Sequence, residues 1–87
     1  MHEKSVMDQL MNKILALANE QQAKKVTKVS VKLGALSHMS KGHFKEHFEI
    51  ASAGTLAENA EIETEESEEI YDPHALSVVL KSIDITK

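Results

Sequence analysis

The sequence contains no cysteine among its 87 residues. This absence excludes disulfide bonds, zinc sites built from thiolates, iron–sulfur clusters and cysteine nucleophiles. Arginine is also absent, so the ten basic residues are all lysine and bidentate recognition of phosphate or guanine is excluded. Because the net charge is −4, we expect no nucleic acid partner.

Long apolar runs are missing as well. None approaches the roughly 20 residues of a membrane-spanning helix, and no basic leader precedes an apolar stretch. We therefore expect no membrane association and a cytoplasmic location. The composition, 41% apolar and 28% charged, is typical of a single globular domain covering residues 1–87. Such a small domain buries little surface, which leaves self-association open.

Hydrophobic periodicity predicts an α/β (α+β) fold with two helices and a three-stranded sheet, in the order α-β-α-β-β. The predicted elements are a helix over residues 5–22, a strand over 25–36, a helix over 40–54 and strands over 60–71 and 76–86. Ser5 is the expected N-cap of the first helix, which leaves residues 1–3 as a tail. Asp72 and Pro73 break the chain, so we expect strands two and three to form a short antiparallel hairpin.

The acidic residues are concentrated late in the chain. Residues 58–87 hold nine acidic residues and two lysines, a balance of −7. Most of them belong to one run with alternating apolar neighbours, which is typical of the solvent-facing side of a strand.

The amino terminus, Met1-His2-Glu3, has the elements of a nitrogen-ligated metal site. The α-amine of Met1, the imidazole and amide nitrogen of His2, and the amide nitrogen of Glu3 can form a planar set of four nitrogens. Such a set suits Ni(II) or Cu(II) and suits tetrahedral Zn(II) badly. Taken alone, three residues are a weak motif, and an incidental histidine remains the alternative.

Other histidines offer accessory ligands. His43 and His47 lie four residues apart and so share one face of the second helix, a spacing that suits two imidazole ligands. Two surface histidines without a metal are the alternative for this pair. His38 lies in the preceding loop, which can approach the amino terminus, whereas His74 lies in the predicted turn.

A series of short motifs runs along most of the chain. They are Met1-His2-Glu3-x-Ser5, Gly34-x-Leu36-Ser37, Phe48-Glu49, Gly54-Thr55-Leu56, Ala60-x-Ile62 and the closing Leu80-Lys81-Ser82-Ile83-Asp84-Ile85. In the order and spacing of these motifs, the chain resembles the HypA/HybF family of nickel-insertion accessory proteins for [NiFe] hydrogenase.

The resemblance implies a nickel metallochaperone rather than an enzyme, with Ni(II) held at His2 by nitrogens of Met1, His2 and Glu3. Some family members carry an acidic residue near position 40 that supports the nickel site, and the resemblance implies Ser40 as a weaker accessory ligand there. It also implies a HypB-like GTPase and the hydrogenase large subunit as partners, with urease maturation as a variant. The family's zinc ribbon, with its two Cys-x-x-Cys pairs, is missing between the second and third strands. We therefore expect a single nickel-binding domain without structural zinc.

Two functions of different classes remain open at this stage. One is nickel delivery through the amino terminus. The other is an interaction or regulatory module that keeps the fold and the partner surface without delivering nickel. An enzyme is not expected, because no phosphate loop, nucleophile elbow or nucleophile–base pair can be identified.

Overall fold

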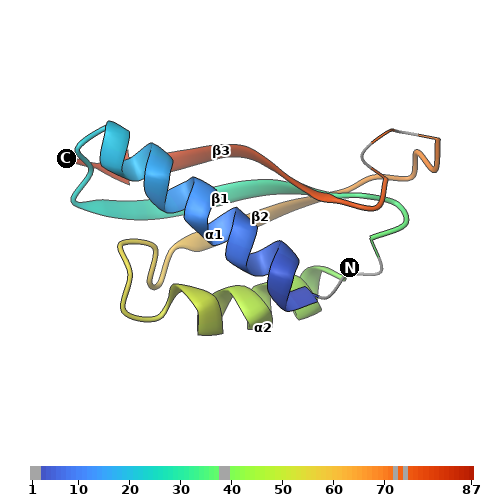
Figure 1. Ribbon diagram of the computed structural model, residues 1–87, viewed down its shortest axis with the longest axis horizontal. Coiled ribbons are helices and arrows are strands. Elements are labelled where there is room, and N and C mark those ends of the chain that lie inside the picture. The colour runs from blue at the N-terminus through green and yellow to red at the C-terminus, as the bar shows by residue number, and fades with distance from the viewer. Residues whose placement is uncertain (1–2, 38–39, 72, 74) are drawn as a thin grey trace.

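A computed structural model describes residues 3–37, 40–71, 73 and 75–87, with side chains described from residue 6 onward. It contains helices α1 (Glu3–Glu20) and α2 (Lys41–Ser52), and strands β1 (Lys25–Leu33), β2 (Glu61–Glu66) and β3 (Val78–Thr86). This order along the chain (Figure 1) confirms the predicted α-β-α-β-β arrangement and the α+β class.

The three strands form one mixed sheet with β1 in the centre, in the order β2-β1-β3. Strand β1 is parallel to β2 and antiparallel to β3. The predicted hairpin between the second and third strands is therefore wrong, since these strands lie on opposite sides of β1. The apolar residues of β1 favour its central position in the sheet, because a central strand is shielded by neighbouring strands on both edges. Helix α2 supplies the crossover that a parallel β1–β2 pair requires.

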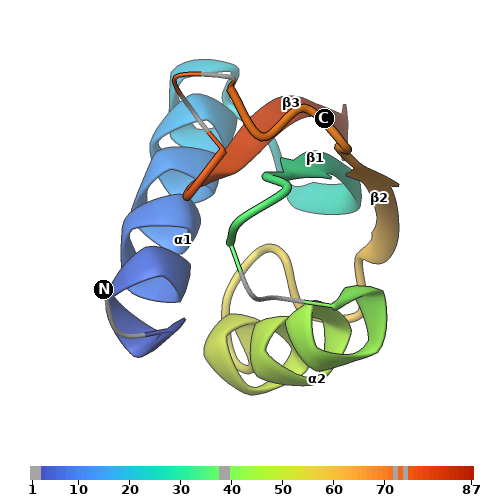
Figure 2. The same cartoon turned by 90° about the vertical axis from the view of Figure 1, so that its right-hand side faces the viewer.

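Both helices pack on the same face of the sheet, which gives the molecule two layers (Figures 1 and 2). The hydrophobic core lies between these layers and draws on every helix and strand. Its most deeply buried large side chains are Phe44, Phe48, Ile14, Leu33, Val26, Val29 and Val31. Ser30 is also buried, at 8% exposure, although the alternation of apolar and polar residues predicts it on the solvent-facing side of β1. Its position in the central strand accounts for this, because neighbouring strands cover it on both sides.

Helix α1 begins two residues earlier than periodicity predicts. Its first residue is Glu3, so Ser5 lies inside the helix rather than at its N-cap, and Glu3 does not belong to a preceding tail.

Candidate metal centre

The predicted nickel ligands lie at the beginning of α1. Met1 and His2 fall outside the described residues, so only the backbone of Glu3 is described among the three. Glu3 is the first residue of the helix, and the first N–H groups of a helix have no carbonyl partner four residues earlier. The amide nitrogen of Glu3 therefore needs no intrahelical hydrogen bond to be broken before it can serve as a ligand.

Ser40, His43 and His47 are positioned by the start of α2. Ser40 is the N-cap, and its Oγ accepts a hydrogen bond from the backbone N–H of His43 at 3.2 Å. That role satisfies one donor of the first turn, so the hydroxyl of Ser40 has a structural function independent of any metal. His38, the other predicted accessory ligand of this loop, lies outside the described residues, as does His74.

The two α2 histidines lie side by side. Their ring centres are 4.6 Å apart, with the ring planes inclined by 41°. Both side chains are half-buried, whereas Phe44 and Phe48, their neighbours in sequence, are fully buried in the core. The predicted pairing of the imidazoles on one helix face is therefore confirmed as geometry, and metal binding by them stays a prediction.

The described residues contain no group of three or more histidine, aspartate or glutamate side chains arranged to hold a metal ion. A metal centre with three or more protein ligands thus needs a side chain outside the described ones, such as His2, Glu3, His38, Asp72 or His74, or ligands from backbone atoms. The predicted amino-terminal site meets this condition, because most of its ligands are backbone or terminal nitrogens.

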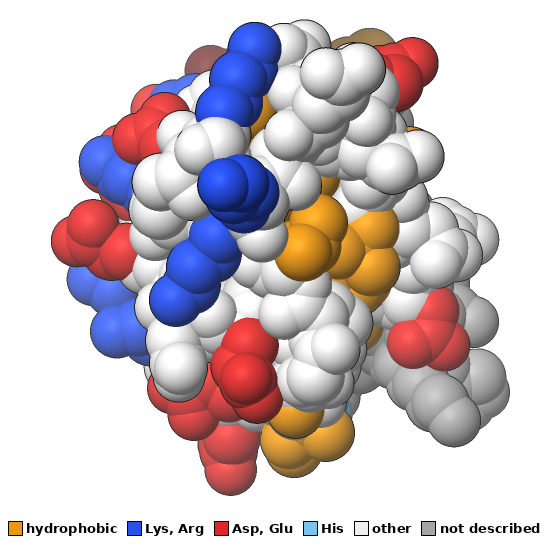
Figure 3. Space-filling model, turned by 90° about the vertical axis from the view of Figure 1, so that its left-hand side faces the viewer, with side chains coloured by type: hydrophobic (Ala, Val, Ile, Leu, Met, Phe, Trp, Pro, Cys, Tyr) orange, Lys and Arg blue, Asp and Glu red, His pale blue; other side chains and the backbone are white. Residues whose placement is uncertain are grey.

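The acidic run forms strand β2 and meets lysines of the sheet. Lys28 Nζ lies 2.8 Å from Glu63 Oε2, and Lys81 Nζ lies 3.6 Å from Glu65 Oε1. The hydrogen bond and the positive charge of Lys28 lower the pKa of Glu63, and Glu63 raises the pKa of Lys28 in turn. In Figure 3, lysine and acidic side chains lie next to one another along the left-hand edge of the molecule. The glutamates are thus part of a solvated, charge-paired sheet face.

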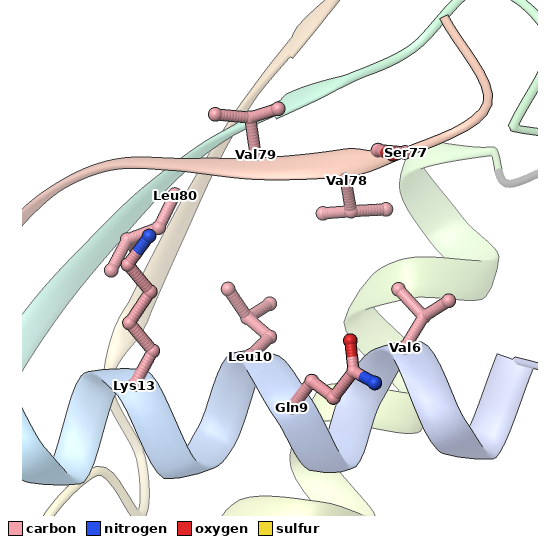
Figure 4. A pocket seen from close by; sticks show the side chains of 8 residues that line it. All are labelled: Val6, Gln9, Leu10, Lys13, Ser77, Val78, Val79 and Leu80. Atoms are coloured by element: carbon pink, nitrogen blue, oxygen red, sulfur yellow. The ribbon is translucent and has the colours of Figure 1, made fainter. Parts of the chain in front are cut away.

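A groove of about 320 Å³ runs between α1 and β3. Figure 4 shows Val78 of β3 pointing towards α1, where Leu10 and Val6 form the opposite wall. Its polar lining comes from Gln9, Lys13 and Ser77. The described side chains that line it include no imidazole or carboxylate, so this groove is not a metal site. Sequence reasoning missed it, because it depends on the placement of α1 against the distant strand β3.

Sequence comparison shows a match to the family model described as "Hydrogenase/urease nickel incorporation, metallochaperone, hypA", over residues 1–72. Among curated proteins, the hydrogenase maturation factor HypA of Archaeoglobus fulgidus is 40% identical over 63 residues, 72% of this chain and 57% of that protein. The HypA of Thermococcus gammatolerans is 38% identical over 71 residues, 82% of this chain and 51% of that protein. The chain thus spans about half the length of the curated relatives it matches.

A solved structure shows the same fold. The solution structure of the Ni metallochaperone HypA from Helicobacter pylori superposes with a TM-score of 0.80 and 21% sequence identity. The match covers 99% of this chain and 98% of that one. No helix within the described part of the chain combines the length and apolar character needed to cross a bilayer.

Proposed function

Since this chain belongs to the HypA family of hydrogenase and urease nickel-incorporation metallochaperones, we propose that it binds Ni(II) at its amino terminus and passes the ion on during hydrogenase maturation. The observation that carries the proposal is the family match from residue 1 to residue 72, which includes the Met1-His2-Glu3 start. The same family membership agrees with the prediction that the chain is not an enzyme.

The proposed ligands are four nitrogens: the amine of Met1, the imidazole and amide of His2, and the amide of Glu3. Two features of the fold support this set. The Glu3 amide belongs to the first turn of α1, where it has no intrahelical carbonyl partner. The positive end of the helix dipole also favours negative charge at this position, which assists loss of the amide protons that coordination requires.

Nickel binding at this site must compete with protons. The amine, the imidazole and both amides lose protons when they coordinate, so affinity falls steeply as pH is lowered. A planar set of four nitrogens gives a yellow, diamagnetic Ni(II) complex, which separates it from octahedral binding. The ion is cargo in this scheme, and the protein supplies selectivity and release rather than a chemical reaction.

We propose the partners on the same basis: a HypB-like GTPase that cooperates in delivery, and the hydrogenase large subunit as recipient. Urease maturation is the variant of the same function. The chain works in this proposal as one nickel-binding domain in the cytoplasm, without the zinc ribbon. Zinc content measured after purification without chelators tests the last point, and stoichiometric zinc would contradict it.

The decisive experiment is a Ni(II) titration of the chain with Met1 as its free amino terminus. We expect one tightly bound equivalent with the spectrum of a planar complex, lost in His2→Ala and in a chain whose amine is acetylated. His74→Ala is the matched control, because it removes one histidine and leaves all four proposed ligands. If His2→Ala retains the planar complex at unchanged affinity, the site assignment is wrong.

The alternative, an interaction module without nickel delivery, predicts a different pattern. The test is a maturation assay in cells. If nickel is delivered through His2, cells that carry a folded His2→Ala variant are expected to lose hydrogenase activity. Full hydrogenase activity with His2→Ala, together with retained partner binding, would instead favour the interaction module.

A further inference from the structure

The imidazoles of His43 and His47 form a pair of metal-ligating side chains on one face of α2. They lie one helical turn apart on α2, and their ring centres are separated by 4.6 Å. The pair is independent of the amino-terminal site in one chemical respect, because it requires neither a free amine nor deprotonated amides.

The spacing of the rings matches two adjacent positions around a metal ion. A metal bonded to one ring nitrogen at roughly 2.0–2.1 Å lies about 3.2 Å from the centre of that ring. If each ring directs one nitrogen at the same ion, a separation of 4.6 Å between the ring centres corresponds to an angle of about 90° between the two bonds, which is the cis angle of planar and octahedral complexes. A tetrahedral ion would place the centres about 5.2 Å apart.

The backbone beneath the pair is held in place before any ion arrives. Phe44 and Phe48 anchor the same two turns of α2 in the core, and the Ser40 cap fixes the start of the helix. A ligand pair on a fixed helix loses little conformational freedom when it binds, which favours chelation.

The two imidazoles lie on the flank of α2 that faces away from a hollow beside β2. On the opposite flank, Glu49 and Ser52 border a hollow closed by residues 58–60 before β2. Helical geometry places His43 and His47 on the other side of the Phe44–Phe48 stripe, where both remain half-buried rather than enclosed. Solvent molecules can therefore complete the coordination of an ion held there.

We propose that His43 and His47 form a second transition-metal site, which binds Ni(II) through two cis imidazoles with water in the remaining positions. Two protein ligands make such a site weaker and faster to exchange than a four-nitrogen site. It goes beyond the proposed nickel site at the amino terminus and does not depend on it, because the two sites share no ligand.

The test uses the full chain with an acetylated amino terminus and the substitution His2→Ala, which removes the amino-terminal ligands. Ni(II) is titrated and followed by calorimetry and by paramagnetic broadening of the imidazole signals. We expect one equivalent, with selective broadening of His43 and His47. Removal of either ring by His43→Ala or His47→Ala is expected to weaken binding about tenfold or more, because chelation is lost.

The matched control keeps the number of histidines and changes only their spacing. In His47→Ala combined with Lys45→His, the two rings stand two residues apart and point to different sides of α2. Lys45 is exposed, so the helix tolerates the exchange, and far-UV circular dichroism checks the fold. The conservative pair His43→Gln and His47→Gln serves as a second test of binding without histidine.

Three results would overturn the proposal. They are unchanged Ni(II) affinity in the chain lacking both histidines, equal affinity in the displaced-histidine control, or broadening centred on other residues. None of these results bears on the amino-terminal site, whose planar complex is measured separately in the chain with a free amine. Failure of one site is therefore distinguishable from failure of the other.

Discussion

Lys28 Nζ donates to Glu63 Oε2 at 2.8 Å, and this contact joins the central strand β1 to the acidic edge strand β2. The side chains are 32% and 60% exposed, respectively. Every second residue from Glu61 to Glu65 is a glutamate on the outer face of the sheet, and the register sets Glu61 opposite Lys28 and Glu65 opposite Lys32 of β1. The acidic run thus contributes to strand pairing instead of forming a separate anionic surface.

This ion pair predicts a pH-dependent difference between wild type and Glu63→Gln. The pKa of Glu63 is lowered by the Lys28 hydrogen bond and charge from its ordinary value of 4.5. Its stabilising contribution is therefore present above pH 4.5 and disappears as the pH falls through the lowered pKa. The pKa of Lys28 is raised above 10.5, so its contribution is present below that pH and is lost only as the pH rises through the raised pKa.

We expect Glu63→Gln to lower the urea midpoint slightly at pH 7, and the difference from wild type to vanish as the pH falls through the lowered pKa of Glu63. High salt is expected to reduce the difference as well, because both side chains are solvent-exposed. Urea unfolding at several pH values measures this directly. A difference that does not shrink as the pH is lowered would show that the carboxylate charge is not its cause.

Helix α2 depends on its two buried phenylalanines. Phe44→Ala is expected to destabilise the protein by about 3–5 kcal/mol, because it leaves a cavity where a fully buried ring stood. Ile50→Ala on the same helix is the matched control, since Ile50 is 74% exposed. Its expected effect is within about 0.5 kcal/mol. Thermal or urea unfolding compares the two, and equal losses would contradict this account of the core.

Two glycines respond to alanine in opposite directions. Gly54 has a φ of +79° in the loop after α2, and the space where a Cβ would stand is open. Gly54→Ala is therefore expected to cost about 1 kcal/mol from the backbone alone. Gly42 lies within α2, without positive φ and with the same open space. Gly42→Ala is expected to stabilise by about 0.4–1 kcal/mol, so equal signs in unfolding experiments would refute the distinction.

Substitutions of Ser40 test whether its hydroxyl caps α2 or also serves as a nickel ligand. Loss of the hydroxyl in Ser40→Ala is expected to cost about 0.5–2 kcal/mol of stability, because the His43 N–H loses its acceptor. Ser40→Asp restores an acceptor and is expected to recover the stability. We expect Ni(II) affinity at the amino terminus to stay unchanged in Ser40→Ala. A parallel loss of nickel affinity in a folded variant would instead make Ser40 a ligand.

Periodicity alone identified most of the secondary structure. The apolar repeats of α1 and β1, and the stop at Gly54, are local patterns that tertiary contacts reinforce. The hairpin error has a different origin, because strand pairing is a long-range property. Alternation shows that residues 61–66 and 78–86 are extended, but it cannot show that β1 lies between them.

The candidate sites likewise combine properties that local sequence predicts with properties that depend on tertiary packing. The chemistry of Met1-His2-Glu3 follows from adjacent residues, whose chelate rings need no tertiary contact. The i, i+4 spacing likewise predicts a shared helix face for His43 and His47. Their ring separation and half-burial depend on side-chain packing over the Phe44–Phe48 stripe, and no repeat in the sequence encodes these quantities.

Composition and local pattern determined that residues 1–87 contain no thiolate ligand and that they form two helices and three strands, and they predict nitrogen ligands for the proposed metal site. Only the tertiary structure decided that β1 is central, that the glutamates of β2 meet the lysines of β1, and that α1 and β3 enclose a groove. The physical reason is that covalent neighbours set dihedral preferences and ligand spacing, whereas pairing and burial depend on which distant surfaces exclude water together.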